Sequence, residues 1–109
     1  MSAEISAAEP VRVSELAAYQ PGAVVSRTLL SRKTGTITLF AFDEGQGLSE
    51  HTAPFDALVH VLEGEVDITI AGNTLKALAG EMVLMPAHQH HALVARTRLK
   101  MLLTMIRSA

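Results

Sequence analysis

The chain has 109 residues, which is enough for one domain with a buried core but too few for two. With 49% hydrophobic and 18% charged residues, its composition excludes a disordered chain of low hydrophobicity and high charge. The formal net charge is -2 and the basic residues are scattered, so no nucleic-acid-binding surface is indicated. Because the chain has no cysteine, a disulfide framework and a thiolate nucleophile are both excluded.

The beginning of the chain, MSAEISAAE, lacks the basic start and apolar region of a signal peptide. No apolar run reaches the roughly 18 residues that suggest a membrane span. We therefore expect a cytoplasmic protein with no nucleic-acid or membrane partner.

Residues 1–22 are predicted to form an arm with a short helix, and residues 23–109 to form a β domain. Ser14 is a candidate N-cap for a helix over Glu15 to Tyr19, which Pro21-Gly22 would end. From residue 23 onward, apolar and β-branched stretches separated by turn residues predict strands over 23–30, 34–42, 48–52, 56–62, 66–71, 74–77, 82–85, 91–96 and 99–107.

The connections between these strands are those of an antiparallel sheet. Gly72-Asn73 offers residues that tolerate positive φ, as a two-residue hairpin requires. Val66, Ile68 and Ile70 alternate with polar residues, which is typical of a half-buried strand. Many short strands with regular turn signals predict an all-β sandwich or small barrel.

Two segments carry a family resemblance. Residues 45–64 read GQGLSEHTAPFDALVHVLEG, and residues 80–95 read GEMVLMPAHQHHALVA. Their spacing of Gly, His and Pro resembles the two motifs of the cupin superfamily, and DALVHVLEGEVDITIAG is similar to the small single-domain cupins of bacteria. Over roughly residues 40–107, this resemblance implies a double-stranded β-helix, the jelly-roll cupin barrel.

The chain departs from both motifs at ligand positions. Ala53 stands where the family's second His is expected, and Ala57 stands where its Glu is expected. In the second motif, His88 replaces a Gly and Ala95 replaces an Asn. The resemblance therefore supports the barrel more strongly than it supports a metal site.

Metal-binding cupins hold a first-row metal with three His and one Glu, and this chain keeps only His51 and His91 of that set. If a metal binds, these two residues are its predicted ligands, and Zn, Fe, Mn and Ni are the candidates. Without a metal, the two imidazoles would form a pair suited to proton transfer or to holding an acidic ligand.

The other histidines are candidate contacts to a bound ligand or a third metal ligand. Because side chains alternate along a strand, counting by twos from Ala57 predicts that Val59 and Val61 point inward and His60 points outward, unless a bulge reverses the alternation. His88 and His90 follow Pro86, where alternation gives no guidance, and they can also be solvated loop residues. The predicted ligand-binding set is His60, His88, His90, Val59 and Met101.

Three functions fit these observations. The first is a small-molecule-binding cupin with an apolar barrel mouth and His51 and His91 as polar anchors. The second is a metal-dependent enzyme of the dioxygenase or isomerase kind, and the third is an interaction module with a vestigial pocket. A homodimer is expected, since a jelly roll has open strand edges, and the segment AVVSRTLL is the candidate contact.

Overall fold

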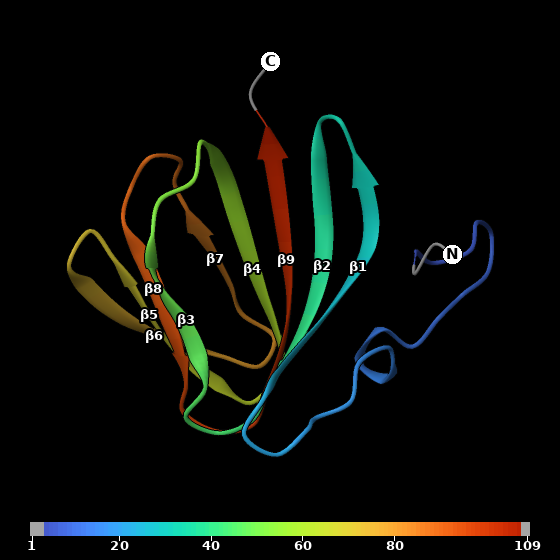
Figure 1. Ribbon diagram of the computed structural model, residues 1–109, viewed down its shortest axis with the longest axis horizontal. Helices are drawn as coiled ribbons and strands as arrows, with labels where there is room; N and C mark the ends of the chain where they lie inside the picture. The colour runs from blue at the N-terminus through green and yellow to red at the C-terminus, as the bar shows by residue number, and fades with distance from the viewer. Residues whose placement is uncertain (1–3, 108–109) are drawn as a thin grey trace.

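The computed structural model describes residues 4–107 and shows a sandwich of two antiparallel sheets (Figure 1). The elements are η1 (Val13–Glu15), β1 (Val24–Arg32), β2 (Gly35–Phe42), β3 (Gly47–His51), β4 (Phe55–Glu63), β5 (Glu65–Ile70), β6 (Asn73–Leu78), β7 (Met82–Met85), β8 (His91–Ala95) and β9 (Leu99–Arg107). The five-stranded sheet has the order β1-β2-β9-β4-β7, and the four-stranded sheet has the order β3-β8-β5-β6. The predicted all-β jelly roll is confirmed.

The main core lies between the two sheets and follows the alternation of the strands. On β4, Ala57, Val59 and Val61 are buried, whereas the residues between them are only partly buried. Val66 and Ile68 of β5 and Met101 of β9 face them and are completely buried. Because burial has a period of two on these strands, each sheet presents one apolar face to the other.

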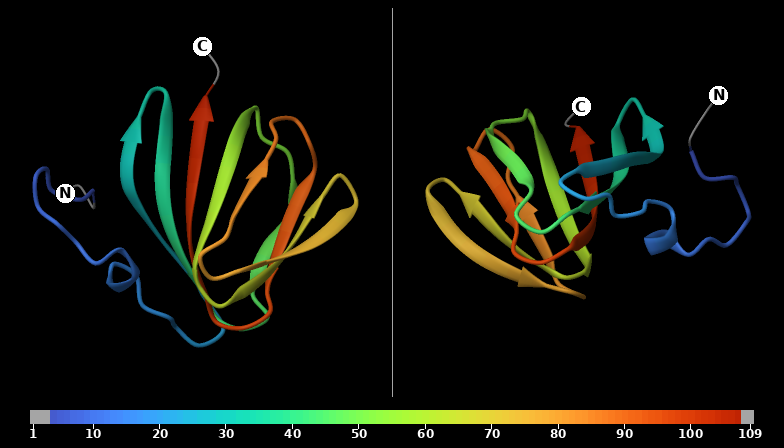
Figure 2. Two further views of the ribbon diagram at one scale, coloured as in Figure 1. Left: turned by 180° about the vertical axis from the view of Figure 1, so that it is seen from behind. Right: turned by 60° about the horizontal axis from the view of Figure 1, so that its bottom comes forward.

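A second apolar cluster lies on the outer face of the five-stranded sheet. Leu29, Leu39 and Ala41 of β1 and β2 pack there against Ala17 and its neighbours in the N-terminal segment. Figures 1 and 2 show this segment running along β1 and β2, outside the sandwich. The segment therefore covers part of the outer face and reaches as far as β4, where the Tyr19 hydroxyl donates to Glu63 at 2.9 Å.

The predicted N-terminal helical turn is present, but its position differs from the expected one. It is a 3₁₀ turn over Val13–Glu15 and not a helix over Glu15 to Tyr19, and no side chain caps it. The backbone carbonyl of Ser14 accepts a hydrogen bond from Lys100 Nζ at 2.6 Å, so this residue fastens the segment to β9 instead of starting a helix. Packing on the sheet has overridden the weak local signal.

The hairpin between β5 and β6 is shifted by one residue from its predicted position. Ile70 pairs with Asn73, so Ala71 and Gly72 are the two turn residues. Their φ angles are 49° and 84°, which places both in the left-handed region that a type I′ turn requires. Asn73, which we expected in the turn, is the first residue of β6.

The turn between β4 and β5 depends on Gly64. Its φ is +85°, and a Cβ at this position would lie 2.0 Å from the carbonyl oxygen of Arg98. Only glycine allows the backbones of the two segments to approach so closely.

Within residues 4–107, no helix is long and apolar enough to cross a membrane.

Candidate functional site

The structure brings His51 and His91 together at one end of the sandwich. His51 is the last residue of β3, His91 is the first residue of β8, and the two are partners in the antiparallel register. Their Nε2 atoms are 3.1 Å apart, and the rings meet edge to face with centroids 4.4 Å apart. His51 is exposed, whereas the side chain of His91 is buried.

A backbone carbonyl determines which nitrogen of His51 carries the proton. Nδ1 of His51 lies 2.8 Å from the carbonyl oxygen of Ser49, and a carbonyl can only accept. We therefore assign the proton of neutral His51 to Nδ1, which leaves Nε2 as an acceptor. In the neutral pair, a hydrogen bond between the two Nε2 atoms then takes its proton from His91.

The surroundings of His91 favour its neutral form. Burial lowers the pKa of His91, and a positive charge on neighbouring His51 would lower it further, whereas the backbone of Gln89 acts in the opposite direction. Nδ1 of His91 is buried and makes no hydrogen bond of normal geometry. A buried polar atom without a good partner costs stability.

A pocket opens beside the imidazole pair. Its empty volume, part of which is open to solvent, is about 380 Å³, and the centre of a water molecule can occupy about 30 Å³ of it. Apart from the two imidazoles, the side chains that line it are all apolar: Leu48, Ala53, Ala57, Met85, Ala92, Leu93, Leu103 and Met105. The site is thus a narrow apolar cleft with one polar edge.

The two alanines at the expected ligand positions are part of the pocket wall. Ala57 is 2% exposed, and its register partners on the neighbouring strands are Met85 and Met105. These three residues form the row of the five-stranded sheet that faces the imidazoles. A methyl group at Ala57 leaves open the space that a longer side chain would fill.

The remaining predicted ligand contacts lie away from this pocket. Val59 and Met101 are completely buried in the main core, one and two rows deeper than Ala57, and neither lines the pocket. His60 belongs to the alternate set of β4 residues that faces outward, and it pairs with Met82 and Leu102. The bulge that would have turned His60 inward is not found at this residue.

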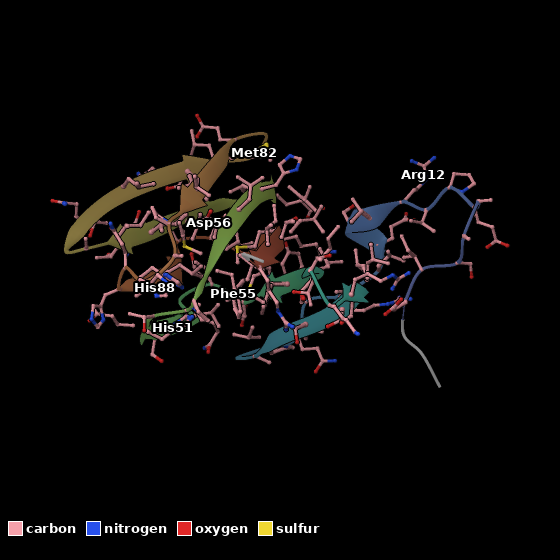
Figure 3. The ribbon with its side chains drawn as sticks, turned by 90° about the horizontal axis from the view of Figure 1, so that it is seen from above. Arg12, His51, Phe55, Asp56, Met82 and His88 are labelled. Atoms are coloured by element: carbon pink, nitrogen blue, oxygen red, sulfur yellow. The ribbon has the colours of Figure 1, made fainter. Side chains whose placement is uncertain are left out.

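His88 and His90 are exposed in the loop that precedes β8. Nδ1 of His90 lies 3.5 Å from a carboxylate oxygen of Glu50, which places this histidine at the rim of the pocket and outside its lining. Figure 3 shows His51 and His88 close together at the open end of the sandwich, well away from Met82.

Backbone N–H groups of this loop make hydrogen bonds across the open end of the barrel. The N–H of His88 donates to the carbonyl oxygen of Ala53 at 2.8 Å, and the N–H of Ala87 donates to Asp56 Oδ1 at 2.9 Å. His88 has a φ of 66°, which explains why a glycine suits this position. These bonds fix the distance between the two motif segments.

The predicted ligand contacts did not include several residues that line the pocket, among them Leu48, Met85, Ala92, Leu103 and Met105. Alternation identifies which residues face inward, but it does not say how deep each one lies. Alternation does not place Met105 at the mouth, and its position there follows from its pairing with Ala57.

The donor set does not fit a catalytic metal site. Among residues 4–107, no group of three or more His, Cys, Asp or Glu side chains is arranged to hold a metal ion. Catalytic zinc normally takes three protein ligands, and only two imidazoles converge here.

Comparisons with known proteins agree with this fold. Residues 38–106 match the Cupin domain family. A conserved Streptococcus pyogenes protein of unknown function is 33% identical, with a TM-score of 0.92 over 97% of this chain and 93% of that one. A cupin 2 conserved barrel domain protein from Leptotrichia buccalis is 37% identical, with a TM-score of 0.83 over 86% of this chain and 46% of that one.

A cupin superfamily protein from Desulfitobacterium hafniense is 27% identical, with a TM-score of 0.90 over 96% of both chains. No curated protein matches this chain significantly. The barrel, the two motif segments and the family match together show that this chain belongs to the cupin superfamily.

Proposed function

We propose that this protein binds a small, mostly apolar molecule in the barrel mouth, with His51 and His91 as polar anchors. The observation that carries the proposal is the pocket itself, whose apolar lining is broken only by the imidazole pair. Concave apolar sites with a few polar groups are the usual form of small-molecule sites. The poorly partnered Nδ1 of His91 supports the same view, because such costs are commonly kept for function.

The size of the pocket limits the ligand to a small ring or a short branched chain. Ala57, Met85 and Met105 form its wall on one sheet, and Leu48 and Leu93 form its wall on the other. A ligand placed between them would have its polar group next to His51, which is the exposed member of the pair.

The methionines provide a direct test of ligand binding. In protein labelled at the methionine methyl carbons, phenol, benzoate, benzamide and toluene are added in turn while the NMR spectrum is recorded. Binding at the mouth should shift the signals of Met85 and Met105, which line the pocket. The signals of Met101, which is buried in the core, and Met82, which is 54% exposed elsewhere, should not move.

A variant that fills the pocket is the matched test. Ala57→Leu adds three carbon atoms at the pocket wall and should abolish the Met85 and Met105 shifts. Ala79→Leu makes the same change at an exposed position outside the pocket and should leave them intact. If no compound shifts Met85 or Met105, or if Ala57→Leu binds as the wild type does, the proposal is wrong.

One observation favours a metal as a second candidate ligand. The two Nε2 atoms face each other, and His51 donates from Nδ1 to a backbone carbonyl, as metal-binding histidines commonly do. Two protein ligands are fewer than a catalytic site needs, so we derive no reaction from this arrangement. Elemental analysis of untagged protein tests it, and near-stoichiometric Zn, Fe, Mn or Ni would favour the metal over the apolar ligand.

A further inference from the structure

Arg107 and Phe55 lie one row above the pocket wall, at the open end of the five-stranded sheet. Ala57 and Met105 belong to that wall and are register partners, and two residues further along the same strands Phe55 pairs with Arg107. Because alternate residues of a strand share a face, Phe55 and Arg107 belong to the same inward-facing set as Ala57 and Met105. Two residues of an extended strand span about 7 Å, so this row borders the mouth through which a ligand would enter.

Phe55 supports the guanidinium group of Arg107. The Cζ atom of Arg107 lies 5.4 Å from the centre of the Phe55 ring, which is within the range of a cation–π contact. Nη1 of Arg107 also donates to the carbonyl oxygen of Lys33 at 3.4 Å. A guanidinium carries five N–H groups, so these contacts position the side chain and leave donors for a further partner. Figure 3 looks onto this end of the barrel, where Phe55 of one sheet and His51 of the other both lie.

The positive charge of Arg107 is not neutralised within the described part of the chain. Among residues 4–107, no carboxylate forms an ion pair with it. Two acidic side chains of the same end have other partners: an oxygen of Glu50 is 3.5 Å from Nδ1 of His90, and Asp56 accepts a hydrogen bond from the N–H of Ala87. The rim of the five-stranded sheet therefore offers a permanent positive charge, because arginine stays protonated in proteins.

This charge distinguishes Arg107 from the imidazole pair. An imidazole can donate to a neutral group or accept from one, so the pair alone does not determine the charge of a ligand. A guanidinium has only donors, and its planar fork fits a carboxylate through two parallel hydrogen bonds. One guanidinium also balances one negative charge, which favours a carboxylate over a phosphate group of higher charge.

Building on the proposed function, we propose that Arg107 determines ligand specificity and that the mouth binds a small apolar carboxylate. The apolar body of the ligand would pack against Ala57 and Met105. Its carboxylate would lie at the rim between the guanidinium of Arg107 on one sheet and the exposed imidazole of His51 on the other.

Three compounds of nearly the same shape test the charge alone. At neutral pH benzoate is an anion, benzamide is neutral and benzamidine is a cation. The methyl signals of Met85 and Met105 in labelled protein would give the dissociation constant of each. Benzoate should bind about tenfold more tightly than benzamide, as a charge-assisted hydrogen bond allows, and benzamidine should bind most weakly. Equal constants for benzoate and benzamide would overturn the role of Arg107 and leave the proposed function intact, whereas no shift with any compound, phenol and toluene included, would overturn both.

Substitutions test which residue supplies the charge. Arg107→Gln should remove most of the preference for benzoate over benzamide, and Arg107→Lys, which keeps the charge without the planar fork, should retain more of it. Arg12→Gln is the matched control, because it removes an exposed charge from the N-terminal segment, far from His51 in Figure 3, and should leave the preference unchanged. An unchanged preference in Arg107→Gln, or an equal loss in Arg12→Gln, would show that Arg107 does not recognise the ligand.

Added salt provides a test that needs no substitution. Arg107 is exposed, so its attraction for an anion is screened as the ionic strength rises. Between about 0.01 M and about 1 M NaCl the Debye length falls from about 30 Å to about 3 Å, and the preference for benzoate over benzamide should fall with it. A preference that does not depend on salt would contradict a contact between the carboxylate and Arg107.

Discussion

His91→Phe separates the functional role of the imidazole pair from a structural one. The substitution keeps a planar ring of similar size at a position that is 5% exposed. It removes the 3.1 Å hydrogen bond to His51, which is worth about 1 kcal/mol. It also removes the buried Nδ1, and an unsatisfied buried polar group costs about 1–3 kcal/mol.

Loss of the hydrogen bond lowers the free energy of unfolding, whereas removal of the buried Nδ1 raises it, and the second effect is the larger. His51 is exposed, so water can replace the bond that it loses. The free energy of unfolding should therefore stay the same or rise by up to about 2 kcal/mol. For a domain of this size, each kcal/mol raises Tm by roughly 4–8 °C.

Thermal and urea unfolding followed by circular dichroism would measure this change, and His60→Phe would be the control. His60 lies half-buried on the outer face and has no imidazole partner. The Met85 and Met105 ligand shifts should disappear in His91→Phe and persist in His60→Phe. A loss of more than about 1 kcal/mol in His91→Phe would refute the reasoning, because the pair would then be a structural fastening.

Three further outcomes are expected. Ala71→Asn should raise the free energy of unfolding by about 0.5–1 kcal/mol, measured in urea, because alanine is strained at a φ of 49° in a type I′ turn; unchanged stability would contradict this. Burial and the hydrogen bond to Glu63 at 2.9 Å raise the pKa of Tyr19 in the folded protein. The stability that the protonated Tyr19 contributes is therefore fully present below pH 10 and is lost as the pH rises through the pKa of the folded state. Tyr19 is the only tyrosine, so an absorbance titration of the folded protein should show no ionisation near pH 10, and ionisation there would exclude the contact. Ala53→His combined with Ala57→Glu restores the donor types of metal-binding cupins next to the imidazole pair. Calorimetric titration should show that the affinity for zinc rises by more than the roughly 10 to 100-fold that outer-shell partners contribute. An unchanged affinity would show that side chains at these two positions do not reach the imidazoles.

The strands could be predicted because burial on this fold follows local alternation. The segments 82–85 and 99–107 were predicted with the bounds that β7 and β9 have in the structure, and the other strands differ at one or both ends by one or two residues. The N-terminal segment could not be predicted in the same way. Its 3₁₀ turn is held by contacts with a distant strand, such as Ser14 with Lys100, which no local pattern encodes.

The candidate site was less accessible to sequence reasoning than the fold. The resemblance pointed to His51 and His91, and the structure places them in contact. The pocket wall is harder to predict, because Val59 and Ala57 are both inward-facing and only the register with β7 and β9 shows which one reaches the mouth. The hairpin at Ala71 lies one residue away from its predicted position, so an error in predicted register can be as small as one residue.

Depth along the barrel separates the residues that hold the fold from those that define the pocket. Val59, Val61 and Met101 fill the rows below the mouth and are completely buried, so changes there would create cavities. Ala57, by contrast, borders the pocket on one side. A side chain at this position can grow into space that a ligand would otherwise occupy without displacing the core. The first row of the barrel can therefore change its chemistry from a charged donor set to an apolar wall while the rows beneath it keep the cupin fold.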